Sequence, residues 1–516
     1  MGTPPAGSDE SLSIWMDSSG SPDYESLRDD IDVDVAIVGA GITGVTAAYL
    51  LAREGASVAL LEKGRIAMSE TGHTTAHITE MIDGDCAEFI RNLGEKRASE
   101  NTDAVRASIE QIRSLVTELR IDCGFHAVDG FLYGEKRKDR NHLKRQQEFL
   151  TRLGVNTEWM ESVPLPFPTI GGLRFPNQYA FNARQYVLAI AEAARMHGAL
   201  IYENSLVKEL KSANRQQRPT ITTEHGRVRS KSIVLATHVP IEDSGALWGR
   251  MRMTRSYVVA APIESGLVPD SLFWDASDPY HYTRILETRK GLHLLVGGED
   301  RGVGKKANDE RRYEGLESYC RDRFGIEEFS HRWSGQINEP ADGIPFIGRS
   351  PHRKSVWMAS GYSGNGITYG TLAGMMLADA TLGRDIRFAR LFDPAREIGP
   401  AVVKRAKNKS ASAAKPRLPR ISYGDVGVKG AAKLLEGQGK VVMIGPRKCA
   451  ISRSGGKIRM LDPTCTHLGC AVSWNDAEKS WDCSCHGSRF RVDGEVLNSP
   501  ATEPLKPFKV PTRGKK

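Results

Sequence analysis

Four residues near the end of the chain have the types and the spacing needed to bind a metal centre. Cys465 and His467 are separated by one residue, and Cys483 and His486 are separated by two. Two thiolates and two imidazoles can hold one [2Fe-2S] cluster, with sulfur ligands on one iron and nitrogen ligands on the other. The same four side chains could instead hold a tetrahedral zinc ion.

The residues around these four resemble the Rieske family of iron–sulfur proteins. The two stretches read Cys465-Thr466-His467-Leu468-Gly469-Cys470 and Cys483-Ser484-Cys485-His486-Gly487-Ser488. The roles that the resemblance implies are Cys465 and Cys483 on one iron, His467 and His486 on the other, and a disulfide between Cys470 and Cys485. A zinc site would leave Cys470 and Cys485 unexplained, so the cluster is the favoured interpretation.

One position departs from the respiratory Rieske proteins. Those proteins place a serine two residues after the last histidine and a tyrosine four residues after it, and both hydroxyls hydrogen-bond to sulfur. Here Ser488 keeps the first position, but Phe490 stands at the second. The loss of one hydrogen bond to sulfur predicts a potential within the Rieske range of about −150 to +300 mV but below its upper end.

A cluster with all its ligand positions filled moves single electrons, so the rest of the chain must supply or receive them.

The chain has 516 residues, which suggests about three domains. Its net charge is +8. The basic residues do not form a stripe interleaved with aromatic residues, so a nucleic-acid partner is not expected. No apolar run reaches the roughly eighteen residues of a membrane span. The first thirty residues are polar and acidic and lack a signal core, which predicts a cytoplasmic protein.

A strand, a glycine-rich turn and a helix follow one another near the start of the chain. The apolar run 33–38 predicts the strand, Gly39-Ala40-Gly41-Ile42-Thr43-Gly44 the turn, and Val45–Arg53 the helix. Such a turn lets the backbone approach a pyrophosphate at the helix N-terminus. A second predicted strand, 57–61, ends at Glu62, which can accept a hydrogen bond from a ribose hydroxyl. The nucleotide could be NAD or FAD on this evidence alone.

Three later stretches favour FAD. They are the small polar run Thr71-Gly72-His73-Thr74-Thr75-Ala76, the predicted strand 232–237, and the run 342–348 with the strand and glycine-rich loop 356–368 that follow it. Together they resemble the D-amino-acid oxidase family, which includes glycine, sarcosine and dimethylglycine oxidases and dehydrogenases. In that family the second glycine-rich loop packs against the flavin ring, where the start of a helix stabilises negative charge.

The resemblance implies a set of site residues. Those expected to bind FAD are Gly39, Gly41, Ile42, Thr43, Gly44, Glu62, Lys63, Thr71, Gly72, His73, Thr74, Thr75, Gly361, Gly364, Asn365, Gly366 and Ile367; those expected to be catalytic are His73, Tyr257 and Tyr362. His73 aligns with a histidine that is joined covalently to flavin in part of the family, although Gly72 replaces a tryptophan there. A histidine that only positions the flavin by a hydrogen bond is the favoured alternative. His77 is expected to be structural.

Two segments interrupt the nucleotide-binding pattern. The first carries amphipathic helical patterns over 98–119 and 139–153, and the second carries short alternating stretches between Met251 and Trp333. The second segment predicts a mostly antiparallel sheet that covers the flavin. Aromatic and cationic groups of this segment, together with Tyr362 of the second glycine-rich loop, are candidate contacts for a small amine or amino acid: Tyr257, His281, Tyr282, Arg284, Arg332 and Tyr362.

The predicted architecture is an α/β FAD-binding domain of the Rossmann type with an inserted, mostly antiparallel α+β substrate domain, followed by an all-β Rieske domain. The predicted boundaries are an irregular arm over 1–30, the oxidoreductase over 31–395, a linker over 396–420 and the Rieske domain over 421–516. Within the oxidoreductase, FAD-binding segments cover about 31–85, 165–245 and 335–395, and substrate segments cover about 86–164 and 246–334. Residues 404–419 are rich in Lys, Ser, Ala and Pro and predict a tether.

These features predict a dehydrogenase acting on a C–N bond. A small amine or amino acid would reduce FAD, and the electrons would pass singly through the cluster to a protein or a quinone-like acceptor. Two alternatives stay open: an FAD amine oxidase that uses O2 with the cluster as a side path, and an electron-transfer or redox-sensing protein without a metabolite substrate. No second strand-linked glycine motif is present, so direct use of NADH is not expected.

Overall fold

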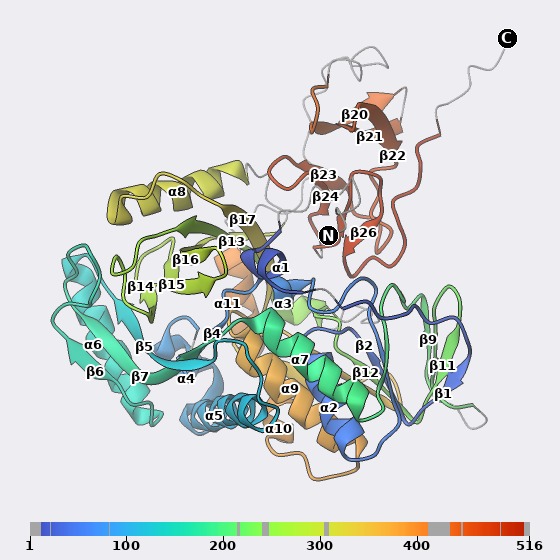
Figure 1. Cartoon of the computed structure of the whole chain (residues 1–516), viewed down its shortest axis with the longest axis horizontal. Coiled ribbons are helices and arrows are strands. Elements are labelled where there is room, and N and C mark those ends of the chain that lie inside the picture. Colours follow the sequence, from blue (N-terminus) through green and yellow to red (C-terminus); the bar gives the residue numbers. More distant parts are fainter. Residues whose placement is uncertain are drawn as a thin grey trace. The chain divides into compact units, whose positions relative to one another are not determined.

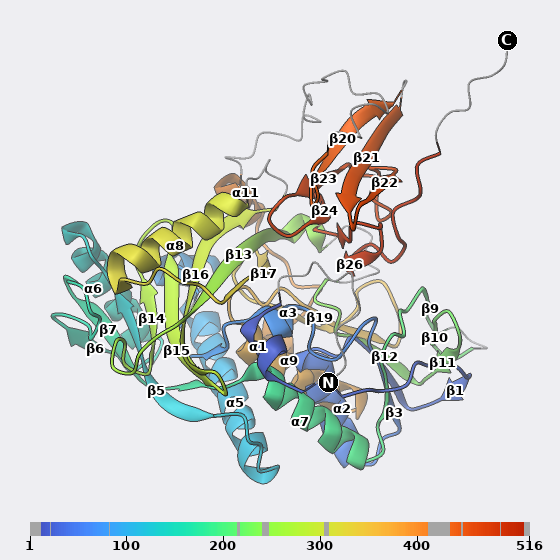
Figure 2. The same cartoon turned by 45° about the horizontal axis from the view of Figure 1, so that its top comes forward.

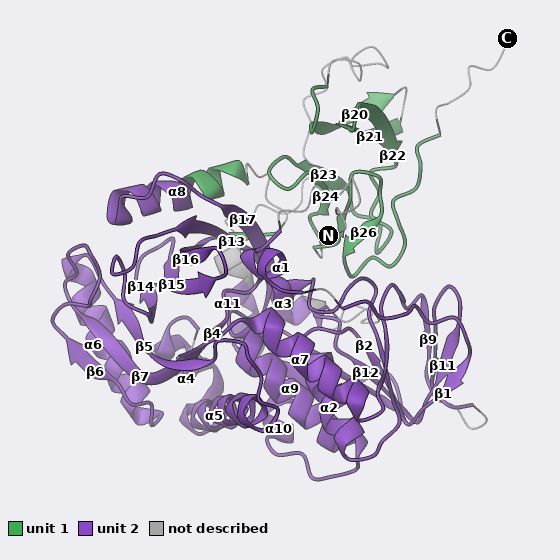
Figure 3. Cartoon of the chain, viewed as in Figure 1, with its two compact units in different colours: residues 1–11, 301–314, 408–516 green, residues 12–300, 315–407 purple. Residues whose placement is uncertain are grey.

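The computed structural model describes residues 12–20, 22–81, 83–213, 217–239, 247–303, 309–410, 434–444, 447–485 and 487–509. The chain divides into two compact units (Figure 3). The larger unit holds residues 12–300 and 315–407, and the smaller unit holds residues 408–516 together with the segment 301–314. No helix among the described residues has the length and the apolar character needed to cross a membrane.

The larger unit contains a six-stranded sheet in the order β18-β19-β12-β2-β3-β8, of which Figure 1 labels β2 and β12. Its strands are β2 (Val35–Val38), β3 (Val58–Leu61), β8 (Leu200–Tyr202), β12 (Ser232–Leu235), β18 (Phe346–Arg349) and β19 (Val356–Ser360). All neighbours are parallel except β18 and β19. Every residue of β2 and β3 is buried, as expected for parallel strands covered on both faces.

Three helices pack together beside this sheet: α2 (Ile42–Arg53), α7 (Ala183–Met196) and α9 (Gly366–Thr381) (Figure 2). Helix α9 crosses α2 closely because two of its three glycines lie at the crossing. A Cβ atom on Gly370 would lie 2.5 Å from Ile42 Cγ2, and one on Gly374 would lie 2.7 Å from Thr46 Cβ. This close crossing holds the starts of α2 and α9 together, although they are more than 300 residues apart in the sequence.

The larger unit also contains a small sheet in the order β1-β11-β10-β9. Its strands are β1 (Ile31–Asp32), β9 (Glu209–Lys211), β10 (Thr220–Thr222) and β11 (Arg227–Arg229). The short elements α3 (Glu70–His73), α10 (Ala389–Phe392) and the 3-10 turn Trp248–Arg250 connect the larger elements.

The second large sheet has nine strands in the order β17-β13-β16-β15-β14-β5-β7-β4, with β6 paired to β7. The strands are β4 (His77–Ile78), β5 (His126–Tyr133), β6 (Glu158–Met160), β7 (Gly172–Ala180), β13 (Met251–Pro262), β14 (Ser271–Asp275), β15 (His281–Thr288), β16 (Gly291–Gly302) and β17 (His331–Pro340). Strand β13 runs antiparallel to β17, and β15 runs antiparallel to both β14 and β16, whereas β14 and β5 are parallel. The predicted antiparallel stretches between Met251 and Trp333 lie in this sheet.

Four helices accompany the second sheet: α4 (Cys86–Leu93), α5 (Glu95–Glu118), α6 (Arg137–Arg152) and α8 (Glu310–Phe324). Helices α5 and α6 coincide with the predicted amphipathic patterns. Their buried side chains recur at helical spacing, such as Leu143, Gln146 and Leu150 in α6.

The structure corrects two predictions of irregular segments, the N-terminal arm and the linker. The arm before residue 30 contains helix α1 (Ile14–Ser18), and Trp15 in that helix is completely buried. The predicted tether begins later than expected, because helix α11 (Pro400–Ser410) continues through its first residues. The rest of the predicted tether, 411–419, lies outside the described residues.

The smaller unit contains two antiparallel sheets (Figure 1). One is formed by β20 (Gly439–Ile444), β21 (Arg447–Ser454) and β22 (Lys457–Leu461), and the other by β23 (Val472–Asn475), β24 (Ser480–Cys483), β25 (Arg489–Phe490) and β26 (Val496–Asn498). Trp481 and Phe490 are fully buried in the second sheet. They pack in one apolar cluster with Cys465 and Cys483.

Candidate functional site

The first glycine-rich turn connects β2 to α2 and has no room for side chains at two of its glycines. Gly39 has a φ of +101°, and a Cβ atom there would lie 2.4 Å from the carbonyl oxygen of Ala236. A Cβ atom on Gly44 would lie 1.9 Å from the carbonyl oxygen of Gly39. The backbone is therefore bare at the N-terminus of α2, which fits the close approach of a pyrophosphate.

Glu62 lies next to this turn. It follows β3, its side chain is buried, and its Oε2 atom accepts a hydrogen bond of 2.9 Å from the backbone N–H of Ala40. Its Oε1 atom accepts a second hydrogen bond, of 3.1 Å, from Gly64 N–H. The carboxylate is thus held at the end of the strand where a ribose hydroxyl is expected.

The loop 71–76 meets the start of α2 on one side and the N-terminal arm on the other. Thr71 Oγ1 accepts a 3.2 Å hydrogen bond from the N–H of Ile42. The carbonyl oxygens of Gly72 and Thr74 accept hydrogen bonds from Ser13 Oγ and Trp15 Nε1 of the arm. The position of this predicted FAD loop therefore depends on the arm.

Two further contacts fix the same loop from the second sheet. The carbonyl oxygen of His73 accepts a 2.9 Å hydrogen bond from Trp333 Nε1. Arg284 Nη1 donates to the carbonyl oxygens of Thr75 and Ala76 at 3.2 and 2.9 Å, and burial lowers the pKa of this arginine to about 10. Arg284 was a candidate substrate contact, but its guanidinium is used to hold the loop.

The imidazole of His73 is only partly buried. Its Nδ1 atom lies 2.8 Å from the carbonyl oxygen of Ser69 and must carry the proton of that hydrogen bond. Nε2 of a neutral ring then keeps its lone pair. This tautomer suits both a hydrogen bond to the flavin and a covalent bond through Nε2.

The second glycine-rich loop, 361–366, precedes α9. A Cβ atom on Gly361, whose φ is +83°, would lie 2.6 Å from Pro340 Cγ. Gly364 N–H donates to Asp83 Oδ2 at 2.8 Å, and Asn365 Nδ2 donates to the carbonyl oxygen of Met81 at 3.3 Å. The first amides of α9, beginning at Gly366 and Ile367, have no acceptor within the helix and can receive an electron-rich edge.

A polar contact joins the two glycine-rich loops. Thr43 Oγ1 and the hydroxyl of Tyr362 lie 2.8 Å apart. Burial raises the pKa of Tyr362, which keeps its hydroxyl protonated. The structure thus brings together predicted FAD residues from both ends of the larger unit.

The structure does not gather all the candidate substrate contacts. Tyr257 is fully buried in β13, and strand alternation places it on the opposite face from Ser256, whose Oγ lies 3.0 Å from the hydroxyl of Tyr282. His281 Nδ1 pairs with Asp275 Oδ2 at 2.9 Å. Arg332 pairs with Glu317. Of the six candidates, Tyr282, Arg284 and Tyr362 lie at the contacts described for the loops and their neighbours, and Arg284 is used there to hold the loop 71–76.

Three acids that the sequence did not single out lie near Tyr282. Asp300 is hydrogen-bonded by Ser256 and lies within electrostatic range of Asp83 and Glu339. Burial is the main cause that raises the pKa of Asp300 to about 7, and it also raises the pKa of Asp83. These three residues follow no spacing motif, so no sequence signal could have grouped them.

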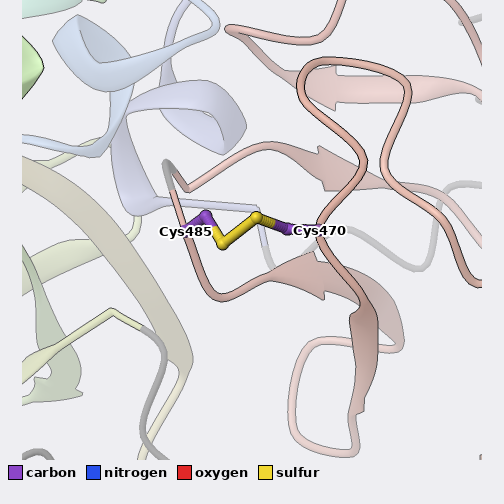
Figure 4. Close-up of a disulfide and its surroundings, with 2 residues drawn as sticks. All are labelled: Cys470 and Cys485. Carbon is purple, nitrogen blue, oxygen red and sulfur yellow. A yellow bond between two sulfur atoms is a disulfide. The ribbon is translucent and has the colours of Figure 1, made fainter. Parts of the chain in front are cut away.

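In the smaller unit, a backbone hydrogen bond closes each of the two predicted cluster loops. Cys465 N–H donates to the carbonyl oxygen of Cys470 at 2.7 Å, and Cys483 N–H donates to that of Ser488 at 2.8 Å. Cys470 and Cys485 form a disulfide that joins the loops (Figure 4). The sulfur atoms of Cys470, Cys483 and Cys485 all lie within 4.8 Å of one another. The disulfide is the pairing that the Rieske resemblance implied.

The cysteines at the two predicted sulfur-ligand positions are adjacent and buried. A hydrogen bond from the Cys483 thiol, assisted by the backbone N–H of His467 and the hydroxyl of Ser488, lowers the pKa of Cys465 to about 6. A thiolate is the form that binds iron, so these residues fit the cluster. His467 Nδ1 is shielded from solvent, and His486 lies outside the described residues.

Comparison with known proteins assigns both units. A model of FAD dependent oxidoreductases (DAO) matches residues 34–380, and a model of the Rieske [2Fe-2S] domain matches residues 426–509. The chain belongs to the DAO family of FAD-dependent oxidoreductases and carries a C-terminal Rieske domain. The family binds FAD, and the Rieske domain binds a [2Fe-2S] cluster. The predicted fold class and both cofactors are confirmed.

Three relatives place this member of the DAO family. The Rieske iron–sulfur protein YhfW of Bacillus subtilis is 31% identical, over 95% of this chain and 96% of its own. Gamma-glutamylputrescine oxidoreductase of Escherichia coli is 24% identical, over 71% of this chain and 87% of its own. The crystal structure of glycine oxidase from Geobacillus kaustophilus superimposes with a TM-score of 0.59 at 21% identity, and it covers 71% of this chain and all of its own.

Proposed function

We propose that this protein is a dehydrogenase that oxidises a small amine or amino acid and passes the electrons singly through its Rieske cluster to an external acceptor. The observation that carries the proposal is one chain with two sites, each fitting its cofactor: the joined glycine-rich loops and the disulfide-tied cluster loops. FAD supplies hydride acceptance from a C–N bond, and the cluster supplies one-electron transfer.

The residues of the chain provide the positions that this chemistry needs. Gly39 and Gly44 admit the pyrophosphate, and Thr43 with Tyr362 holds the two loops in register. His73 would contact the flavin through Nε2, because its Nδ1 is bound to Ser69. Tyr257, on the far face of β13, would support the sheet and not touch the substrate.

The substrate class is supported by the relatives. Gamma-glutamylputrescine oxidoreductase and glycine oxidase are named for compounds that contain an amine. The acceptor in the proposal is a one-electron carrier protein or a quinone-like molecule, since a cluster gives up one electron at a time. An oxidase that gives electrons to O2 is the second candidate, favoured by the likeness to glycine oxidase.

Anaerobic stopped-flow mixing of the holoprotein with amines, followed by EPR of the cluster, tests the proposal. We expect bleaching of the flavin absorbance and then the EPR signal of a reduced cluster. Reduced flavin beside an oxidised cluster would support the oxidase instead. Flavin that no amine reduces would leave only an electron-transfer or redox-sensing role.

Covalent attachment through His73 has its own measurement. Protein denatured in acid should release all its FAD if His73 only forms a hydrogen bond. Flavin fluorescence that stays with the denatured polypeptide, and is lost in His73→Ala, would show the covalent bond.

A further inference from the structure

Three carboxylates in the larger unit lie near one another, and among the described residues one arginine acts on them. They are Asp83, Asp300 and Glu339, and the cation is Arg252, which forms an ion pair with Glu339. Glu339 Oε1 also accepts a 2.8 Å hydrogen bond from Thr254. Among the described residues, the group therefore has more carboxylates than cations, and Asp300 and Glu339 are only partly exposed to solvent.

The position of the group borders both predicted flavin loops. Asp83 accepts the N–H of Gly364 in the second glycine-rich loop. Asp300 is linked through Ser256 to the hydroxyl of Tyr282, and Tyr282 is in turn hydrogen-bonded to Thr75 of the loop 71–76. A molecule held by these acids would therefore lie beside the loops that are proposed to hold the flavin ring.

One oxygen of the group has no partner. Oδ1 of Asp300 is shielded from solvent and receives no hydrogen bond from any described residue. A buried carboxylate is costly unless a cation or a donor satisfies it. Unlike Glu339, neither Asp300 nor Asp83 has an ion pair with a described lysine or arginine.

We propose that Asp83, Asp300 and Glu339 form the binding site for a cationic group of the substrate, so that the protein acts on diamine-like substrates and not on simple amino acids. This inference rests on the proposed amine oxidation and names its substrate class. An ammonium group beside Asp300 would satisfy the unpaired oxygen and offset the excess negative charge.

The surrounding arginines support this choice. A substrate carboxylate would need an available guanidinium, but Arg252 is paired with Glu339 and Arg284 is bound to backbone carbonyls. Arg255 donates to Ser334 and lies on the opposite face of β13 from Ser256. A carboxylate placed at Asp300 would meet like charges.

Three amines of equal chain length test the inference. They are 1,4-diaminobutane, with a cation at both ends; 1-aminopentane, with a methyl group at the far end; and 4-aminobutanoate, with a carboxylate there. Dissociation constants come from the change in the flavin absorbance of the anaerobic holoprotein, and flavin reduction is followed in the same samples. We expect the diamine to bind at least about tenfold more tightly than either of the others.

Two variants that remove the charge of one acid distinguish the effect of the carboxylate from an effect on folding. Asp300→Asn and Asp83→Asn keep an oxygen acceptor but remove the charge. Each should weaken 1,4-diaminobutane about tenfold or more and should change 1-aminopentane by less than about threefold. Asp103→Asn, at an exposed position of α5, is the matched control and should change neither constant.

The outcomes distinguish this inference from the proposed function. Tighter binding of 4-aminobutanoate, or unchanged diamine binding in Asp300→Asn, would overturn the cation site even if amino acids reduce the flavin. Diamine binding that depends on Asp300 without any flavin reduction would keep the cation site and overturn the proposed dehydrogenase.

Discussion

Phe490 is a residue beside the predicted cluster ligands that does not itself bind iron. Its ring is fully buried in the apolar cluster that contains Cys465 and Cys483, and Ser488 keeps its hydroxyl near Cys465. A tyrosine at this position could add a second hydroxyl near the sulfur atoms, whereas phenylalanine cannot.

We expect Phe490→Tyr to raise the cluster potential by roughly 60 mV, because a hydrogen bond worth about 1.4 kcal/mol corresponds to that shift for one electron. A redox titration monitored by EPR measures the change. Phe508→Tyr, in a different apolar cluster of the same unit, should leave the potential unchanged. An unchanged potential in Phe490→Tyr with a fully loaded cluster would contradict the role assigned to the missing hydroxyl.

Asp300 makes stability depend on pH. Its pKa of about 7 in the folded protein lies above the value of about 3.9 for an unfolded chain. A raised carboxyl pKa stabilises the fold at low pH, and this contribution is lost as the pH rises through about 7. The groups that act on Asp300 are Ser256, Glu339, Asp83 and Arg252.

Asp300→Asn should therefore melt at a higher temperature than the natural protein at pH 8, by at least about 2 °C, and at the same temperature near pH 4. Thermal unfolding of both proteins, without amine, measures this. Asp103→Asn should shift neither melting point. A melting point that falls at pH 8 would show that the charged carboxylate stabilises the fold.

At the scale of elements, the crossing of α2 and α9 sets the distance between the two glycine-rich loops. Gly374→Ala would place a Cβ atom 2.7 Å from Thr46 Cβ and 3.0 Å from the carbonyl oxygen of Thr43. We expect the helices to separate at a cost of about 1–3 kcal/mol and the purified protein to contain less FAD. The ratio of flavin to protein absorbance measures the loss. In Gly249→Ala, where a Cβ atom meets nothing within 4 Å, the ratio should stay the same.

Helix α1 acts on the FAD loop through one indole hydrogen bond. Trp15→Phe removes the donor to the carbonyl oxygen of Thr74 but keeps most of the buried apolar surface. We expect about 1 kcal/mol less stability and FAD bound several-fold more weakly, as measured by titration of the apoprotein. Trp159→Phe removes an indole that donates to Glu161 at the surface and should leave FAD binding unchanged. Equal FAD affinity in both variants would show that the hydrogen bond from α1 does not affect FAD binding.

At the scale of the whole molecule, the cluster can be removed from the chain while the flavin site stays intact. We expect Cys483→Ser to lose the cluster, to keep its rate of flavin reduction by amine, and to lose turnover with one-electron acceptors. Steady-state assays with such an acceptor, beside stopped-flow traces, measure both rates. Cys449→Ala, a buried cysteine of another apolar cluster in the same unit, should keep both. Full turnover without the cluster would make the cluster a side path.

Local motifs predicted the two cofactor domains because each motif is a short run whose backbone shape and ligand types are set by neighbouring residues. The strand, turn and helix around Gly39 and the loops around Cys465 are of this kind. Asp83 comes from a loop more than 200 residues before the two strands that carry Asp300 and Glu339, so only the folded sheet brings the three acids together.

The N-terminal arm contains an apolar signal for its helix, but the polar composition of the arm as a whole concealed it. Ile14 and Trp15 form an apolar pair inside a polar stretch, and both side chains are buried. The helix over Pro400–Ser410 was missed for the opposite reason, because its Lys-rich and Ala-rich sequence has no apolar period although these residues are good helix formers.

The hydrogen bonds from the arm also affect the choice of the first residue for a recombinant chain that should bind flavin. A recombinant chain starting at Ile31 would keep every strand of the six-stranded sheet and the whole glycine-rich turn. It would nevertheless lack Ser13 and Trp15, the donors to Gly72 and Thr74. Expression boundaries drawn from the nucleotide-binding motif alone would thus yield a folded protein that retains its flavin poorly.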